Sequence, residues 1–347
     1  MDTVNHETHS NVLTPEAPLI DPYENVISFY QLPDVANNEK MIRPLSSESE
    51  HLARLAFANH FNESIDDIYP DILDTTPERR AMEVAARDFV KQTIGVQPTG
   101  NVYWQDATRA TPYQGLSGTH DSLYRANYIK VYNHPHDDLK YMFEMSTLVH
   151  ELAHSTADDG DTIAAFSTKN NDGSNDLAIN NHLGMHVIKL EKNDQQLTTK
   201  MNGQFFEEAF AEETAARWRE QFSPFIANTP HGRWSNGTKK LPLRFFDYNY
   251  TSEGPAYAPV DNNSSYPAHA LSLLSEKAGV DLYDLMCQAR QPEHKAEAKR
   301  TFIRAINSVD DGLYQKLRNL QYTEEDFLAG LDIVQDVINT PDTTATE

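Results

Sequence analysis

The stretch that decides the fold is residues 137–156, DDLKYMFEMSTLVHELAHST. Its apolar residues recur at spacings of three and four, at positions 139, 142, 143, 145, 148, 149 and 152. That period places them along one stripe of an α-helix, which is stable when the stripe is buried. The two aspartates at its start suit the positive end of the helix dipole. The sequence therefore predicts an amphipathic helix over 137–156 with one buried face.

The last turns of this helix carry His150-Glu151-Leu152-Ala153-His154, the pattern HExxH. Two histidines four residues apart lie on the same helix face, so both imidazoles can bind one Zn²⁺ ion. Zinc lowers the pKa of a bound water, and Glu151 can take the proton of that water and deliver it to a leaving group. The alternative is an ordinary helix with two surface or capping histidines. We predict one zinc ion per chain, with His150 and His154 as ligands and Glu151 as the catalytic base.

The pattern resembles that of the zincin metallopeptidases, in which a strand-and-helix half carries HExxH on its active-site helix. Downstream, Glu208-Ala-Phe-Ala-Glu212 is similar to the third-ligand helix of the gluzincin branch, to which thermolysin belongs. The resemblance covers 147–156 and 205–216. It implies that Glu208 completes the zinc shell and that Glu212 hydrogen-bonds a ligand histidine. The chain departs from the thermolysin arrangement in its long segment between the two motifs and in Glu207, which stands where Asn often precedes the ligand.

The residues of 205–222 support the same choice independently, because four glutamates compete there: 207, 208, 212 and 213. Helical periodicity places Glu208 and Glu212 on one side with Phe205 and several alanines, the side most readily buried. A buried carboxylate requires a partner, and zinc or a zinc-bound imidazole supplies one. The same periodicity places Glu207 on the opposite, solvated side. Glu208 is therefore the predicted ligand, with Glu212 as the main alternative and Glu213 as a further buried one.

Composition and charge exclude several kinds of partner. The formal net charge is −23, so we expect no binding to nucleic acid or to anionic membranes. No window approaches the run of about 18 apolar residues that a membrane span requires. The first residues lack the basic start and apolar stretch of a signal peptide. The single cysteine, Cys287, rules out an intrachain disulfide and is compatible with a reducing compartment. A cytoplasmic location is the resulting expectation.

We expect an α+β fold with four segments. Residues 1–45 form a disordered or loosely docked tail, within which ENVISFYQL (24–32) is a candidate docking segment. Residues 46–263 form a zincin-like domain with a small mixed sheet and the active-site helix. Residues 264–340 form a helical subdomain, and 341–347 form a frayed end.

Local patterns predict the individual elements. Helices are expected at 77–95 and 205–222 and almost continuously from 266 onward. Strands are expected at 101–105 and 123–133, and the second is a candidate edge strand that could pair with an extended peptide. A hairpin is expected over 185–200. The stretch 158–181 is expected to be a loop, and 223–263 a long irregular connection.

The predicted function is zinc-dependent hydrolysis of peptide bonds in a peptide or protein substrate. The alternatives are a zinc hydrolase of non-peptide amides or esters, and a degenerate zincin that binds a partner without turnover. Tyr266, His269 and His231 are candidates for stabilising the oxyanion that forms on the substrate. His134 and His136 are better explained as a turn before a helix than as metal ligands.

Overall fold

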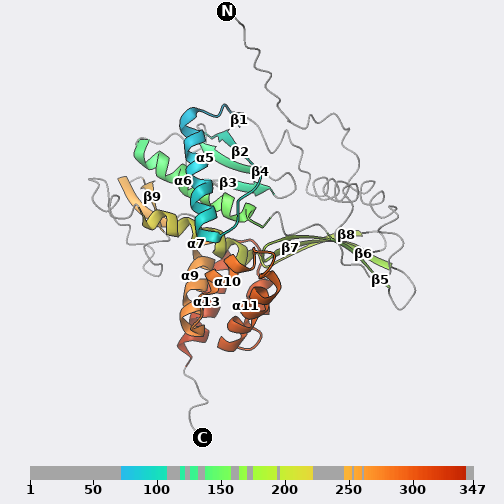
Figure 1. Ribbon diagram of the computed structural model, residues 1–347. Coiled ribbons are helices and arrows are strands. Elements are labelled where there is room, and N and C mark those ends of the chain that lie inside the picture. Colours follow the sequence, from blue (N-terminus) through green and yellow to red (C-terminus); the bar gives the residue numbers. More distant parts are fainter. Residues whose placement is uncertain are drawn as a thin grey trace, which may run out of the picture.

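The computed structural model describes residues 72–107, 118–121, 126–131, 137–157, 164–169, 175–193, 196–221, 246–251, 254–259 and 262–340. The predicted tails 1–45 and 341–347 lie outside these ranges, as do His134, His136 and His231. The described residues form a mixed sheet, an antiparallel sheet, a hairpin and many helices (Figure 1). The predicted α+β class is therefore confirmed.

The mixed sheet contains β1 (Ile72–Leu73), β2 (Asn101–Asp106), β3 (Gly118–Asp121) and β4 (Ala126–Val131). Its order is β1-β2-β4-β3, with β2 and β4 parallel and the other pairs antiparallel. The strands predicted at 101–105 and 123–133 are thus present. However, β4 is paired on both sides, so the prediction that 123–133 is an edge strand is wrong. Among the described strands of this sheet, β3 lies at the edge beside β4.

Two helices complete this part of the molecule. Helix α6 (Asp137–Ser155) packs against β3 and β4, and α5 (Pro77–Ile94) packs against α6. The hydroxyl of Thr76 caps the start of α5 by accepting a hydrogen bond from the backbone N–H of Arg79. Gly95 ends α5 with φ of 83°, a left-handed conformation that favours glycine. Both predicted helices are confirmed to within one residue at each end.

An antiparallel sheet connects α6 to α7. Its strands are β5 (Ala164–Lys169), β6 (Asn175–Leu183), β7 (His186–Asn193) and β8 (Gln196–Asn202), paired in chain order. Figure 1 shows the sheet extending away from the helices. The predicted hairpin is confirmed as β7–β8, but the loop predicted over 158–181 is wrong because β5 and β6 lie there. A second hairpin, β9 (Phe246–Thr251) with β10 (Gly254–Pro259), interrupts the stretch predicted to be irregular.

Helix α7 (Gln204–Glu220) lies between α6 and the C-terminal helices and packs against α6 and α9. The C-terminal helices are α9 (Asn262–Ala278), α10 (Leu282–Gln288), α11 (Lys295–Val309), α12 (Leu313–Arg318) and α13 (Glu324–Asn339). They confirm the prediction of a largely helical end.

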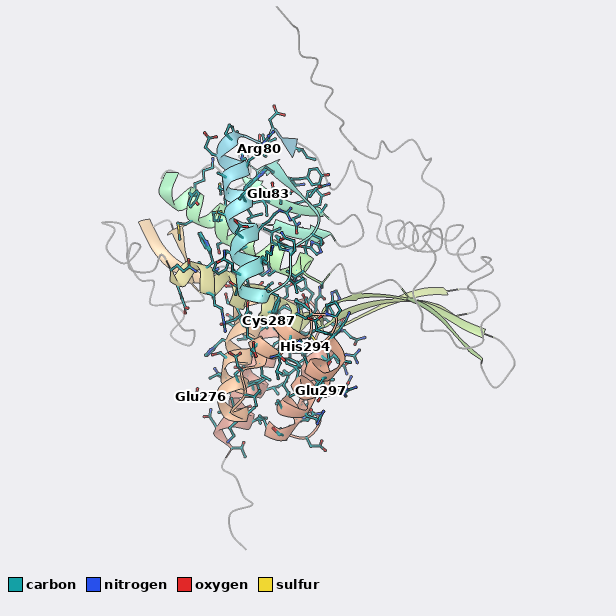
Figure 2. All side chains as sticks on the ribbon, viewed as in Figure 1. Arg80, Glu83, Glu276, Cys287, His294 and Glu297 are labelled. Atoms are coloured by element: carbon teal, nitrogen blue, oxygen red, sulfur yellow. The ribbon has the colours of Figure 1, made fainter. Side chains whose placement is uncertain are left out.

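One hydrophobic cluster runs through the described residues from α5 to α13 and includes Trp104, Leu148, Phe206 and Phe302. Cys287 is buried where α10 meets this core, whereas Glu297 on α11 is exposed (Figure 2). The predicted boundary between 263 and 264 stays a prediction. No helix in the described ranges is both long enough and apolar enough to cross a bilayer.

Candidate metal centre

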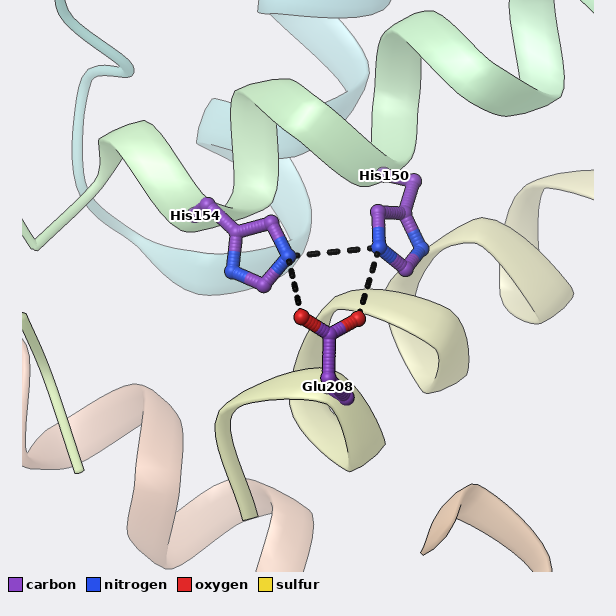
Figure 3. A group of neighbouring side chains, drawn as sticks. All are labelled: His150, His154 and Glu208. Atoms are coloured by element: carbon purple, nitrogen blue, oxygen red, sulfur yellow. Dashed lines mark hydrogen bonds and ion pairs between the residues drawn. The ribbon is translucent and has the colours of Figure 1, made fainter. Parts of the chain in front are cut away.

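Two helices bring together three side chains that could hold a metal ion: His150 and His154 on α6 and Glu208 on α7 (Figure 3). The two histidine Nε2 atoms are 3.2 Å apart. The carboxylate oxygens of Glu208 lie 3.3 Å from Nε2 of His150 and 3.7 Å from Nε2 of His154. Ligand atoms around a tetrahedral zinc ion are about 3.3 Å apart, given metal–ligand bonds of roughly 2.0–2.1 Å. The three donors therefore fit a single ion of this size, and two imidazoles with one carboxylate form a ligand set used by catalytic zinc.

Apolar packing sets the spacing of the two ligand helices. Leu148, Val149 and Leu152 of α6 are fully buried, as are Phe206 and Phe210 of α7, and all five belong to the same hydrophobic cluster. Burying each such side chain contributes about 1.5–3 kcal/mol to folding. Because α6 and α7 pack directly against each other, the three side chains are brought together by the fold itself. Metal binding need not assemble the site.

The carboxylate of Glu208 is buried, with only 8% of the residue exposed. Ser264, at the start of α9, donates a hydrogen bond from its hydroxyl to Oε2 of Glu208 over 3.1 Å. This contact restrains the carboxylate that faces both histidines. No pattern in the sequence pointed to Ser264, since Ser264 and Glu208 lie on different helices and are 56 residues apart in the chain.

Glu212 lies beside Nδ1 of His150. Its Oε2 atom is 3.4 Å from Nδ1 of His150, on the side of the ring away from Glu208. Glu212 is only 1% exposed and forms an ion pair with Arg219. Arg219 also donates to the hydroxyl of Ser146 on α6 over 2.6 Å. These contacts join α6 to α7 and hold the Glu212 carboxylate beside the imidazole.

The solvated position predicted for Glu207 is wrong, because this residue is only 3% exposed. Nearly every side chain of α7 is buried, since the helix is enclosed by α6 and the C-terminal helices. The Oε1 atom of Glu207 lies 3.5 Å from Nδ1 of His154 and forms an ion pair with Arg290. The backbone N–H of Met185 donates to Oε2 over 3.0 Å. Glu207 therefore holds the position behind His154 that Glu212 holds behind His150.

Glu151 is buried beside the three clustered residues. Burial raises the pKa of its carboxyl group above the usual value, and the nearby His150 and His154 only partly offset this effect. Gly118 on β3 provides the space, because a Cβ atom there would lie 2.7 Å from Oε1 of Glu151. The edge strand thus covers the carboxylate predicted to be the base.

The charges in the site favour protonated histidines and ionised glutamates when no metal is bound. Burial alone would lower the pKa of His154, but attraction to Glu208 and hydrogen bonds with Glu207 and Glu208 raise it to about 9. The pKa of His150 also lies well above its usual value, because Glu208 and Glu212 outweigh burial. The pKa of Glu208 is lowered by the two histidines despite its burial. A bound metal cation would take the place of the protons on His150 and His154 and would supply the positive charge that the neighbouring glutamates require.

The other predicted candidates in the described residues are not members of the three-residue cluster. Glu213 is buried, and its Oε1 accepts a hydrogen bond from Arg217 over 3.1 Å. Tyr266 packs against the core, and burial raises its pKa, with a smaller contribution from the charge of Glu324 on α13. His269 is buried on α9.

Two further histidines belong to the surroundings of the site. The ring of His120 on β3 is nearly parallel to that of His154, with centroids 6.3 Å apart, and its Nδ1 lies 2.9 Å from Oδ1 of buried Asn127. His186, at the start of β7, is buried, and burial lowers its pKa to about 4, so the ring is neutral. Neither lies in a recognisable motif. The sequence alone offered no signal for their proximity to His154.

Comparison with known proteins gives no relative for this chain: no family model, curated protein or solved structure matches it.

Proposed function

We propose that this protein is a zinc-dependent hydrolase of peptide bonds, of the zincin type with a glutamate as third ligand. The observation that carries the proposal is the convergence of His150, His154 and Glu208 within 4.8 Å of one another, with Glu151 buried beside them. The chain order of these residues is that of the gluzincin pattern. Glu212 at the Nδ1 atom of His150 agrees with the same pattern.

The residues present divide the chemistry between them. His150, His154 and Glu208 would hold the ion, which when bound supplies a Lewis acid and lowers the pKa of water. Glu151 then takes one proton from the attacking water and passes it to the leaving nitrogen as the C–N bond breaks. Burial raises the pKa of Glu151, which suits a group that must hold a proton between these two events.

A digest of a broad peptide library tests this proposal. The zinc-loaded protein should cleave peptides, a chelator should stop the cleavage, and added zinc should restore it. Glu151→Gln should retain zinc but lose at least ~10²-fold in rate, because an amide cannot accept the proton. Glu144→Gln is the matched control, since Glu144 is also a buried glutamate on α6 but is paired with Lys140. It should cleave at the wild-type rate.

Three results would contradict the proposal. Cleavage by Glu151→Gln at the wild-type rate would exclude this glutamate as the base. Zinc-dependent turnover of simple esters or amides without cleavage of any peptide would identify a non-peptide hydrolase. Tight zinc binding without turnover of either class would identify a binding protein.

A further inference from the structure

Each of the two ligand histidines is backed by a buried glutamate that is paired with an arginine. Behind His150, Glu212 is paired with Arg219 on the same helix. Behind His154, Glu207 is paired with Arg290, which lies 83 residues away and follows α10. The second pair is not part of the pattern that identified the ligands. It connects the C-terminal helices to the metal centre.

Contacts engage both oxygens of the Glu207 carboxylate, which is not a member of the cluster of His150, His154 and Glu208. Oε2 accepts a hydrogen bond from the backbone N–H of Met185. Oε1 forms an ion pair with Arg290 and lies 3.5 Å from Nδ1 of His154. Gly184 packs directly against this carboxylate, and a side chain at that position would collide with Oε2. Glu207 is thus held as an acceptor for His154 rather than as a fourth ligand.

Arg290 connects both ligand helices. Its Nε donates to the hydroxyl of Thr156 over 3.0 Å, and that hydroxyl donates to the carbonyl of Ala153 over 2.6 Å, at the end of α6. Its guanidinium group lies 3.5 Å from the ring centroid of Phe210 on α7 and pairs with Glu207 on the same helix. Arginine suits this role because its planar group donates several hydrogen bonds in fixed directions.

We propose that Glu207 and Arg290 are positioning residues that fix the ring of His154 for metal binding. The inference rests on the metal centre of the proposed function but not on its hydrolytic activity. Glu207 accepts the Nδ1–H of His154, which leaves the Nε2 lone pair directed at the metal. Arg290 pairs with that carboxylate and holds it in place. The C-terminal helices thereby determine the geometry of a ligand on α6.

The double variant Glu207→Met/Arg290→Met tests the proposal. Replacing both charges with apolar side chains of similar size avoids leaving either one buried without a partner. The expected result is a 10–100-fold weaker affinity for zinc, measured by competition with a chelator, and an altered visible spectrum of the cobalt(II)-substituted protein. The matched control is Glu213→Met/Arg217→Met, because that Glu–Arg pair is also on α7 but is not part of the cluster of His150, His154 and Glu208. Its affinity and cobalt spectrum should equal those of the wild type.

Wild-type zinc affinity and cobalt spectrum in the Glu207→Met/Arg290→Met variant would overturn the proposal. A measurement on the unmodified, zinc-loaded chain covers the case in which this variant does not fold. Nitrogen-15 spectra of the histidines should show His154 bound through Nε2, with a slowly exchanging proton on Nδ1. Binding through Nδ1 would refute the role of Glu207. Neither readout involves peptide cleavage, so failure of the hydrolase proposal would leave these results interpretable.

Discussion

Zinc binding should release about two protons per ion near neutral pH. The pKa of His154 is raised to about 9 and that of His150 lies well above its usual value, so both rings carry a proton at pH 7 before the metal binds. The pKa of Glu208 is lowered, so this ligand has no proton to lose. A ligand imidazole must be neutral, and each ring therefore loses one proton on binding zinc. With two protons released, the association constant should rise about 100-fold between pH 6 and pH 7.

The metal-free protein is titrated with zinc against a competing chelator at several pH values across this range. These titrations measure how steeply the logarithm of the association constant rises with pH. Calorimetry in buffers of different ionisation enthalpy counts the protons directly. The matched control His294→Ala, which removes an exposed histidine at the start of α11, should leave the number of released protons at two. An affinity that is independent of pH in the wild type would show that these histidines are not protonated ligands, and the account of the site would be wrong.

Further predictions concern the ligands, the base and stability. Glu208→Ala should empty the site at ordinary zinc concentrations, whereas Glu212→Gln should weaken affinity by only about 10–100-fold; zinc titration showing the reverse order would make Glu212 the ligand. Gly118→Ala should slow hydrolysis while zinc affinity is retained, because the new methyl group displaces Glu151; a wild-type rate, equal to that of the neighbouring control Thr119→Ala, would contradict this. The raised pKa of His154 stabilises the metal-free fold below about pH 6.5, and this stabilisation is lost as the pH rises through about 9. Urea unfolding of the metal-free protein should therefore show a stability that falls across that range, and an unchanged stability would argue against the charged site.

The sequence predicted those parts of the fold whose periodicity is strong. The helix at 137–156 and the helix beginning at Pro77 have clear apolar spacing and end signals, and both are present. Strands β5 and β6 were missed because sequences such as NDLAINNHL are rich in Asn and read as a loop. Their strand structure depends on pairing with β7, which local sequence does not reveal.

The sequence predicts which side chains converge where their spacing is local, and it does not where the contact depends on distant partners. His150 and His154 are four residues apart on one helix, so their convergence follows from helix geometry. Glu207 was misplaced because helical periodicity assumes one buried side, whereas α7 is enclosed on all sides. The partner that neutralises Glu207 is Arg290, 83 residues further along the chain. Arg219, by contrast, is only seven residues from Glu212, and this spacing on one helix could have indicated the pair.

The most direct test of the central claim is to measure zinc occupancy and peptide cleavage on the same sample while zinc is added to the metal-free protein. Cleavage should rise in proportion to occupancy, reach its maximum at about one zinc per chain, and disappear when His150 or His154 is replaced by alanine. Cleavage that is independent of zinc, or that persists in both alanine variants, would contradict it.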